Sequence, residues 1–359
     1  MALTQVDGGL LSPTNGQFYG FKNRIINGAM VIDQRNAGAA VTPTTNVYSL
    51  DRWEFFVTQA SKVTFQQNAG SVTPPAGFKN YLGFTVGASA NVTVGSTDLF
   101  IIDQYIEGYN IADLGFGAAG ASTVSLSFWV RSSLTGTFGG SFTNSGNSRS
   151  YPFTYTISTA NTWEQKTITV AGDTSGTWLS TNGTGLGVRF SIGTGSTYLG
   201  TAGAWDGAGY FGATGQTNLV TTNSATFYIT GVQLEKGSTA TSFDYRPYGT
   251  EFMLCQRYFQ SRVGYNVMMS SRYSTNLIFF SYALPVVMRT TPAVSNASGW
   301  SATSTTASEN SINSTVNAVL TSSGGNVDVI INSSFNPAVY VYFTSHTSTT
   351  VPTLFSAEL

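Results

Sequence analysis

Apolar and polar residues alternate along much of this chain with the period of a β-strand. In the segment ATFYITGVQL, Phe227 and Ile229 alternate with Tyr228 and Thr230, and STVSLSFWV shows the same pattern. A period of two is typical of strands that bury one face. Such segments recur between residues 22 and 248, separated by turns rich in Gly, Ser, Asn and Thr. Many short strands without a long helical pattern predict an all-β fold, a β-sandwich or a jelly roll.

Examples of the expected strands of this region are WEFFVTQ, KVTFQQN, YLGFTVG, DLFIIDQYI, STVSLSFWVRSS, YPFTYTI, TWEQKTITVAG, GLGVRFSIG and ATFYITGVQL. Ahead of them, the apolar segment RIINGAMVI contains Asn27-Gly28, a dipeptide suited to the positive backbone angles of a tight turn. We expect this first segment and the last strand, near Val232, to lie side by side and close one sandwich.

Three other regions flank the predicted sandwich. Gly, Pro and Asn break any periodicity over residues 1–21, which predicts an irregular arm. A short helix is expected over residues 249–260, with Thr250 as its N-cap. Residues 261–359 are expected to form a smaller β domain, with strands around NLIFFSYALPVVM, NVDVIINSS and AVYVYFTS. The predicted order is thus an arm, a jelly roll over residues 22–248, a helical connector and a C-terminal β domain.

Several of these motifs together resemble a known group of proteins. NRIINGAMVIDQR is followed by YSLDRW, and GVQLEKG is followed by FDYRPYGTE and LCQRYF. In this order, over roughly residues 22–259, they resemble bacteriophage virion proteins. Those proteins are tail-fibre or other appendage subunits whose central domain is similar to the jelly-roll carbohydrate-binding modules. The linked order of the motifs is more specific than any single motif.

The resemblance implies a binding function without catalysis. A tail-fibre or appendage subunit would bind host-surface glycan through the jelly roll and attach to other virion proteins through the arm. It would associate as a homotrimer, with the C-terminal β domain as a tip or oligomer contact, and would be located in the virion after assembly in the host cytoplasm. The alternative is a capsid or tail decoration or connector protein with a purely architectural role. A depolymerase is a third possibility.

Charge is scarce in this sequence. Charged residues make up 9% of the chain, and 16 basic and 17 acidic residues give a formal net charge of −1. Typical soluble domains contain about 25% charged residues. There is no basic excess for nucleic acid or for an anionic membrane. The N-terminus also lacks a signal-peptide pattern, and no run of ~18 apolar residues occurs. We therefore expect neither nucleic-acid binding nor membrane insertion.

One stretch combines large aromatic residues with amide and carboxylate side chains among many glycines. Glycans are held by aromatic faces and by groups that hydrogen-bond hydroxyls, and Gly-rich surroundings indicate exposed loops rather than strands. The candidate glycan-binding residues are Trp178, Asn182, Tyr198, Trp205, Asp206, Tyr210 and Phe211. The alternative is that these rings cover one end of the sandwich.

The other tryptophans considered are expected to be structural. Trp53, Trp129 and Trp163 lie in or beside apolar strand patterns, which favours packing over ligand contact. In the block Asp51-Arg52-Trp53 the two charged residues are expected to brace a turn.

The acids of this sequence do not stand out as a catalytic pair for glycoside hydrolysis. Asp103 and Glu107 lie four residues apart in a predicted strand, which corresponds to ~13 Å at ~3.3 Å per residue. Paired catalytic carboxylates are roughly 5–9.5 Å apart. The other acids considered are Asp98, Asp113, Asp173 and Asp206. The repeats of a β-helix depolymerase are missing as well, so no catalytic residue is predicted.

No cofactor or metal site is predicted either. Jelly-roll carbohydrate-binding modules often hold a structural calcium, which prefers carboxylate oxygens. The matching positions here are Val31, Thr230 and Gly231, and none of them carries a carboxylate. The weak substitutes are Asp33, Asp51 and Asp244.

The single cysteine and the single histidine are far apart in the sequence. Cys255 lies in the apolar segment FMLCQRYF and is expected to be a buried small residue. His346 lies in a Ser/Thr-rich tail and is expected to be an exposed turn residue rather than a general base.

Overall fold

The computed structural model describes residues 21–262, 268–274, 277–295, 300–304, 316–319, 326–332, 341–346 and 353–359. The chain forms two compact units, Met1–Pro247 and Tyr248–Leu359. Apart from Phe21, the arm expected over residues 1–21 lies outside the described residues.

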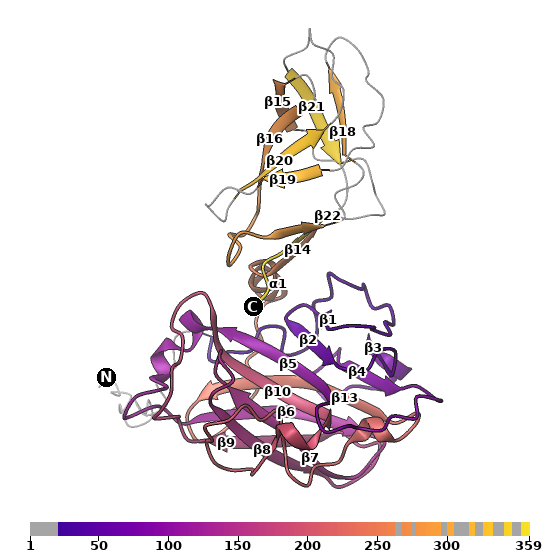
Figure 1. The fold of residues 1–359 in the computed structure, drawn as a ribbon, viewed down its shortest axis with the longest axis vertical. Helices are drawn as coiled ribbons and strands as arrows, with labels where there is room; N and C mark the ends of the chain where they lie inside the picture. Colours follow the sequence, from indigo (N-terminus) through magenta and orange to yellow (C-terminus); the bar gives the residue numbers. More distant parts are fainter. Residues whose placement is uncertain are drawn as a thin grey trace, which may run out of the picture. The chain divides into compact units, whose positions relative to one another are not determined.

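The first unit is a sandwich of two antiparallel sheets (Figure 1). Sheet I has the strand order β1-β2-β5-β10-β7-β8, and sheet II has the order β3-β4-β13-β6-β9. Sheet I consists of β1 (Val47–Leu50), β2 (Trp53–Val57), β5 (Leu99–Glu107), β7 (Gly136–Thr143), β8 (Ser150–Ile157) and β10 (Thr184–Thr194). Sheet II consists of β3 (Val63–Gln67), β4 (Leu82–Val86), β6 (Val124–Ser132), β9 (Glu164–Val170) and β13 (Thr226–Lys236). The predicted all-β jelly-roll sandwich is confirmed.

Short elements occupy the connections of this sandwich. A parallel pair, β11 (Leu199–Gly200) and β12 (Gly212–Ala213), lies between β10 and β13. The 3₁₀ helices are η2 (Ala69–Ser71), η3 (Gly108–Asn110), η4 (Ala112–Leu114), η5 (Ser196–Tyr198) and η6 (Leu219–Thr221).

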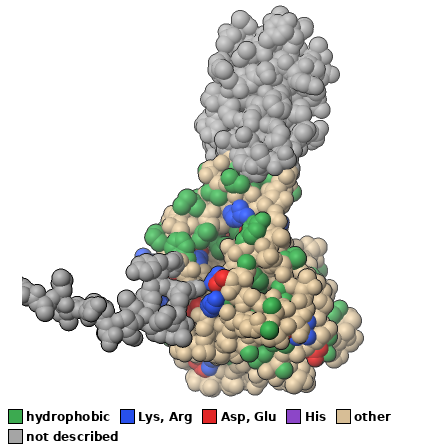
Figure 2. All heavy atoms as spheres, turned by 90° about the vertical axis from the view of Figure 1, so that its left-hand side faces the viewer, with side chains coloured by type: hydrophobic (Ala, Val, Ile, Leu, Met, Phe, Trp, Pro, Cys, Tyr) green, Lys and Arg blue, Asp and Glu red, His purple; other side chains and the backbone are tan. Residues whose placement is uncertain are grey.

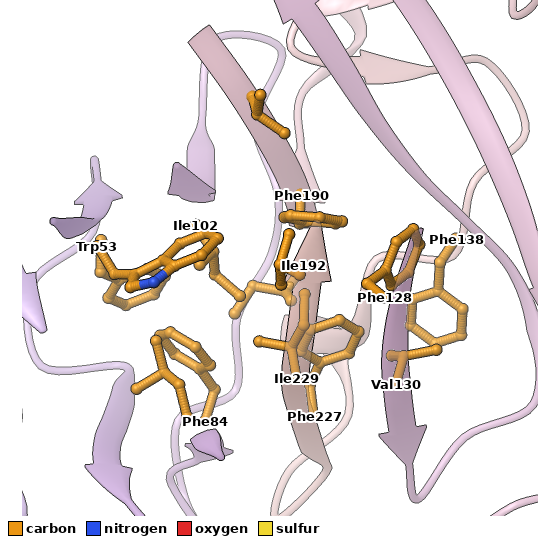
Figure 3. Close-up of a cluster of buried hydrophobic side chains, with 14 of the residues drawn as sticks. Trp53, Phe84, Ile102, Phe128, Val130, Phe138, Phe190, Ile192, Phe227 and Ile229 are labelled. Atoms are coloured by element: carbon orange, nitrogen blue, oxygen red, sulfur yellow. The ribbon is translucent and has the colours of Figure 1, made fainter. Parts of the chain in front are cut away.

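Alternation along the strands builds the core between the two sheets, as the period of two predicts. Phe128 of β6 and Phe227 and Ile229 of β13 belong to one buried cluster with Phe190 of β10 and Trp53 of β2 (Figure 3). All five side chains are fully buried, and each such burial stabilises the fold by about 1.5–3 kcal/mol. On the face drawn in Figure 2, charged side chains are sparse over the described atoms, as the composition requires.

The segment over residues 23–32 closes the sandwich along the last strand. β4 pairs with β13 only over Thr226–Ile229, and beyond that point this segment takes its place beside β13. Arg24 N donates to Leu234 O at 2.8 Å, and Val232 N donates to the carbonyl oxygen of Gly28 at 2.9 Å. The expected neighbourhood of the first segment and the last strand is therefore confirmed, although the segment is not a regular strand.

The same segment also bonds to sheet I. The Gln104 side chain of β5 accepts from Ile26 N at 2.9 Å and donates to Ile26 O at 2.9 Å. Trp53 Nε1 donates to the carbonyl oxygen of Asn27 at 3.0 Å. Asn27 Nδ2 in turn donates to the carbonyl oxygens of Ile32 and Asp51. The segment is thus fixed to both layers of the sandwich.

Asn27 and Gly28 play different parts in the turn that the sequence predicted. Asn27 adopts φ 58°, a left-handed conformation that Asn tolerates better than most residues. Gly28 is required by a close approach, because a Cβ there would lie 2.1 Å from the carbonyl oxygen of Val232.

The two ends of the first unit lie beside each other. Lys22 N donates to Asp244 Oδ2 at 2.9 Å. Arg246 donates to the carbonyl oxygens of Asn23 and Ile25. The FDYRPYG motif therefore binds the NRIING motif directly.

The second unit begins with the helix α1 (Tyr248–Gln256). The expected short helix is confirmed, but its bounds differ from 249–260: it begins directly after Pro247, whose fixed φ suits a helix start, and Thr250 lies inside it rather than capping it. The helix ends at Gln256, and β14 begins at Phe259. Cys255 is fully buried, as expected.

Two sheets follow in the second unit. The first has the order β14-β22-β17, and the second has the order β18-β21-β15-β16-β20-β19. Their strands are β14 (Phe259–Arg262), β15 (Met268–Ser274), β16 (Leu277–Ala283), β17 (Ala293–Ser295), β18 (Trp300–Ser304), β19 (Val316–Val319), β20 (Asn326–Asn332), β21 (Val341–His346) and β22 (Thr353–Ser356). His346 thus ends a strand, which corrects its assignment to a turn.

Replacing Gly28 by Ala tests the closure of the sandwich. The added methyl group meets backbone rather than a flexible side chain, so we expect a loss of about 2–4 kcal/mol in the free energy of unfolding. Urea unfolding measures this change. Gly207→Ala is the matched control, since a Cβ there meets nothing within 4 Å, and its stability should change by about 0.5 kcal/mol or less. Equal stabilities for the two variants would contradict the close approach.

Candidate functional site

The outer face of sheet I, opposite the core, carries a group of polar side chains on three neighbouring strands. Arg189 of β10 lies in register with Asp103 of β5 on one side and with Ser141 of β7 on the other. Two residues along the strand, on the same face, Gly187 lies between Tyr105 of β5 and Thr143 of β7. All but Gly187 and Tyr105 are at most 4% exposed.

Arg189 is the centre of this polar face. Its Nη1 donates to Asn147 Oδ1 at 2.9 Å, and its Nη2 donates to the Tyr105 hydroxyl at 3.2 Å. Its Nε lies 3.6 Å from Asp103 Oδ2. The guanidinium also lies over the Phe211 ring, with Cζ 4.0 Å from the ring centroid. The cation is therefore engaged through all three nitrogens and one face.

Burial changes the titration of two members of the group. Desolvation raises the pKa of Asp103 to about 6, against the opposing charge of Arg189. Desolvation, together with the Asp103 charge, raises the pKa of Tyr105 above its ordinary value. Both groups thus resist becoming anionic at this face.

Three buried oxygens of this face have no hydrogen-bond partner among the described residues. They are Asp103 Oδ1, Ser141 Oγ and Thr143 Oγ1. Leaving a buried polar atom unpaired costs about 1–3 kcal/mol. Such groups in a native structure indicate a strain reservoir, a functional role or bound solvent. All three lie on the two strands that flank β10, namely β5 and β7.

A stack of aromatic rings lies over the polar face. Tyr198, which ends η5, is parallel to Phe211, with centroids 5.2 Å apart and planes at 7°. Both rings are half-buried, whereas Arg189 beneath Phe211 is 4% exposed, so Tyr198 is the outer member of the stack. Tyr210 packs instead on Gly200, where a Cβ would lie 2.3 Å from its ring.

Trp178 and Trp205 belong to a different group. They contact each other edge to face at 5.4 Å, and Phe116 contacts both. The indole Nε1 atoms donate to the carbonyl oxygens of Ser175 and Ala171. Both indoles pack against the core cluster. These two rings therefore extend the core.

The loop that carries Trp178 is held by a salt bridge. Arg149 binds Asp173 through Nε and Nη2 at 2.7 and 2.8 Å. Asn144 Nδ2 donates to the carbonyl oxygen of Thr177 at 3.0 Å. Asp173 is thereby fixed as a structural ligand of Arg149.

The last two candidates are exposed. Asn182 lies in the turn before β10. Asp206 pairs with Ser150 through its backbone, and its Oδ1 accepts from Ala208 N at 3.0 Å. The structure therefore distributes the seven candidates over two ring groups and two surface turns.

The Gly-rich stretch is not the continuous loop that its composition indicated. Gly185, Gly187 and Gly193 lie inside β10. Neighbouring atoms leave them no room for a side chain: a Cβ at Gly185 would lie 2.6 Å from Gly108 Cα. Close packing, rather than flexibility, explains these glycines.

The structure shows where Trp53, Trp129, Trp163 and Asp51 lie. Trp53 is fully buried in the core. Trp129 and Trp163 are half-buried, and Trp163 packs on Tyr81. Asp51 accepts from Gln34 N and Nε2 at 2.7 and 2.6 Å, which confirms that it braces a turn.

Sequence reasoning missed Tyr105, Arg189, Asn147, Ser141 and Thr143 as members of one site. The available signal was a charged residue at an outward position of an apolar strand, Arg189 in GVRFSIG. Its partners come from strands far away in sequence, so their register could not be inferred.

The remaining acids form no metal cluster. Within the described residues, no three His, Cys, Asp or Glu side chains are placed to hold a metal ion. Asp98 accepts from Thr58 and Gln59, and Asp33 accepts from Gly38 N. In the same part of the chain, no helix has the length and apolar character needed to cross a membrane.

Comparisons with known proteins give structural likeness only. No family model and no curated protein matches the sequence. The enzymatically active domain of tailspike protein 4 of bacteriophage CBA120 is similar with a TM-score of 0.32 and 12% identity, over 60% of this chain and 22% of that chain. The family 11 carbohydrate-binding module of a cellulosomal cellulase of Clostridium thermocellum has a TM-score of 0.26 and 11% identity, over 57% of this chain and 96% of that one. The CBM22-1 xylan-binding domain of Paenibacillus barcinonensis Xyn10C has a TM-score of 0.27 and 12% identity, over 57% and 99%. At these scores the likeness adds nothing to the topology described above.

Replacing Thr143 by Val tests the unpartnered hydroxyl. The substitution keeps the shape and removes a buried polar atom without a protein partner, so the free energy of unfolding should stay the same or rise by up to about 1 kcal/mol. Thr230→Val is the matched control, because this buried hydroxyl donates to Asn80 O at 2.7 Å, and it should lose about 1 kcal/mol. Equal losses in urea unfolding would show that Thr143 has a partner.

The pKa of Asp103 makes stability depend on pH. A folded-state pKa of about 6, above the ordinary 3.8, means that protonation favours the native state. That contribution is fully present below about pH 4 and is lost as pH rises through about 6. Relative to Asp103→Asn, the native protein should lose roughly 1–3 kcal/mol between pH 4 and pH 7. Parallel pH profiles of unfolding free energy would contradict this.

Proposed function

We propose that this chain is a non-catalytic, glycan-binding subunit of a bacteriophage tail fibre or related appendage. The glycan would lie on the outer face of sheet I, against Tyr198 and Tyr105. The exposed Asn147 side chain would border the site.

One observation carries this proposal: a half-exposed aromatic stack lies over a buried, incompletely paired polar face. Sugars present an apolar ring face and a rim of hydroxyls, so their sites combine an aromatic ring with fixed hydrogen-bonding groups. Tyr198 supplies the ring, and the Arg189–Asp103 group supplies the fixed polar surroundings. β-strands hold these groups more rigidly than loops would.

The assignment to a virion rests on the order of motifs in the sequence. NRIING contacts both DRW and FDYRPYG in the closure of the sandwich: Trp53 bonds to Asn27, and Arg246 bonds to Asn23. Because these motifs meet in the folded chain, they can be treated as one combined sequence motif. Homotrimer formation, attachment through residues 1–21, and a tip or oligomer contact over residues 261–359 belong to the same proposal, with assembly in the host cytoplasm.

A decoration or connector protein is the second candidate. The observation that favours it is the packing of Trp178 and Trp205, whose Nε1 atoms bond to backbone and whose rings pack on the core. These two candidates from the sequence would then support the fold or a subunit contact rather than touch sugar.

Replacing Tyr198 by Ala tests glycan binding. Loss of the outer ring should weaken binding to a glycan selected on an array by about tenfold, which corresponds to ~1.4 kcal/mol of stacking energy. Calorimetric titration with the full chain measures the change. Tyr245→Ala removes another exposed ring, located beside Phe78 and Phe243, and should leave the affinity unchanged. Equal affinity for both variants would exclude Tyr198 from the site.

Imaging separates the virion proposals. A labelled antibody against this chain, applied to intact particles, should bind at tail appendages in the first case. Label over the capsid surface would support the decoration protein, and an absence of label on particles that contain the chain would contradict an exposed appendage.

A further inference from the structure

Asn147 is the exposed member of the group around Arg189. Nη1 of Arg189 donates to Asn147 Oδ1 at 2.9 Å. A guanidinium carries donors and no acceptor, so the amide of Asn147 has to turn its oxygen toward Arg189. The amide nitrogen, Nδ2, then points away from Arg189 and has no partner among the described residues. The side chain therefore offers a ligand two N–H donors.

The backbone around Asn147 fixes the direction of this amide. Asn147 adopts φ 49°, a left-handed conformation that Asn tolerates better than most residues. Its backbone N donates to Asn144 O at 3.2 Å, and Asn144 Oδ1 accepts from the backbone N of Ser148 and of Arg149 at 2.9 and 3.1 Å. Arg189, which holds the amide oxygen, is 4% exposed. A donor fixed in this way loses little conformational freedom when a ligand binds.

The amide lies beside the aromatic stack. Arg189 contacts both, because its Nη1 bonds to Asn147 and its Cζ lies 4.0 Å from the Phe211 ring centroid. The chain just before Phe211 also packs on the amide loop, since a Cβ at Gly209 would lie 3.1 Å from Asn147 Cβ. Tyr198 is the outer ring of the stack. One ring face and one fixed donor thus border the same part of the outer face of sheet I.

A donor beside an aromatic ring favours one kind of sugar substituent. A hydroxyl group both donates and accepts, so it is satisfied only where an acceptor is open as well. The two side-chain oxygens next to Nδ2, Asn147 Oδ1 and the Tyr105 hydroxyl, already accept from Arg189. An acetyl group presents a carbonyl oxygen, which only accepts. Its methyl group is apolar and can pack on an aromatic ring.

On the basis of the proposed function, we infer that the site selects sugars that carry acetyl groups. Asn147 Nδ2 donates to the acetyl carbonyl oxygen, and the acetyl methyl group lies against the ring of Tyr198. Arg189 does not touch the sugar and is a positioning residue, which turns the amide of Asn147 and supports Phe211. Selection concerns the acetyl substituent, attached to nitrogen or to oxygen, rather than the linkage.

Matched pairs of uncharged glycans test this selection with the full chain. The tetramer of N-acetylglucosamine is compared with cellotetraose, which has the same linkage and a hydroxyl in place of each acetamido group. Acetylated glucomannan is compared with the same polymer after mild alkali has removed its O-acetyl esters. An array of bacterial surface glycans, printed before and after deacetylation, covers other backbones. In calorimetric titration, at least one acetylated member should bind about tenfold or more tightly than its parent. The pair that responds distinguishes N-acetyl from O-acetyl recognition.

Replacing Asn147 by Asp tests the donor. The new carboxylate still accepts from Arg189, but the N–H groups of Nδ2 are gone, so affinity for the acetylated glycan should fall about tenfold or more while affinity for the parent changes little. Asn161→Asp is the matched control. Asn161 is exposed, lies in the turn between β8 and β9, adopts φ 58° and would receive the same charge. This variant should bind like the native protein, and urea unfolding verifies that both variants are folded.

The possible failures are distinguishable. If parents bind as tightly as their acetylated forms, or if the arrayed glycans that bind carry no acetyl group, the inference is overturned while glycan binding stands. Equal affinities of the Asn147→Asp and Asn161→Asp variants for the acetylated glycan would overturn it as well. If neither matched pair and no arrayed glycan binds, both the inference and the proposed function fail.

Discussion

A close contact between two backbones, Gly28 against the carbonyl group of Val232, is the constraint on which the sandwich depends. β13 continues beyond Ile229, where its pairing with β4 ends. A strand edge with unpaired backbone groups is unfavourable in a folded interior. Residues 23–32 supply the missing partners only if they approach β13 to hydrogen-bonding distance. Glycine permits that approach, and Asn27 then fixes the turn to sheet I through Trp53.

The two sides of sheet I differ in the side chains that they bury. Toward the core, Phe190 lies in a cluster of mainly apolar side chains. Toward the outside, Arg189, Asp103 and Tyr105 form a network that leaves oxygens unpaired. Natural domains keep such a network where its cost is offset by function or by bound solvent. These observations are the reason for proposing that binding occurs on the outer face, while the tryptophan group packs against the core.

Local pattern predicted the strands well and the site incompletely. β6 and β13 were evident because alternation follows directly from burial of one face. β7, with the sequence GTFGGSFT, is harder to recognise as a strand, because it contains three glycines. They are there for close packing: a Cβ at Gly140 would lie 2.2 Å from the carbonyl oxygen of Arg189. The pairing register between strands that are far apart in the sequence cannot be inferred from a local pattern either.

The candidate site shows the same limit in more detail. The sequence brought Tyr198 and Phe211 into one candidate group because both are aromatic residues among glycines. It gave no sign that Phe211 would cover Arg189, since that contact depends on the path of the connection after β10. The start of α1 at Tyr248 was also missed, because Thr250 satisfies the usual preference for a cap while Pro247 sets the actual boundary.

The bond between Lys22 and Asp244 places the entry and exit of the first unit at one point. Tension applied along the polypeptide from residue 21 to residue 247 would then act first on this junction and on the contacts of Arg246 with residues 23 and 25. The strands of the sandwich would bear little of this tension, because the force would pass directly between the two ends of the unit. The resistance of this unit to pulling would therefore be set by the few bonds that join its two ends.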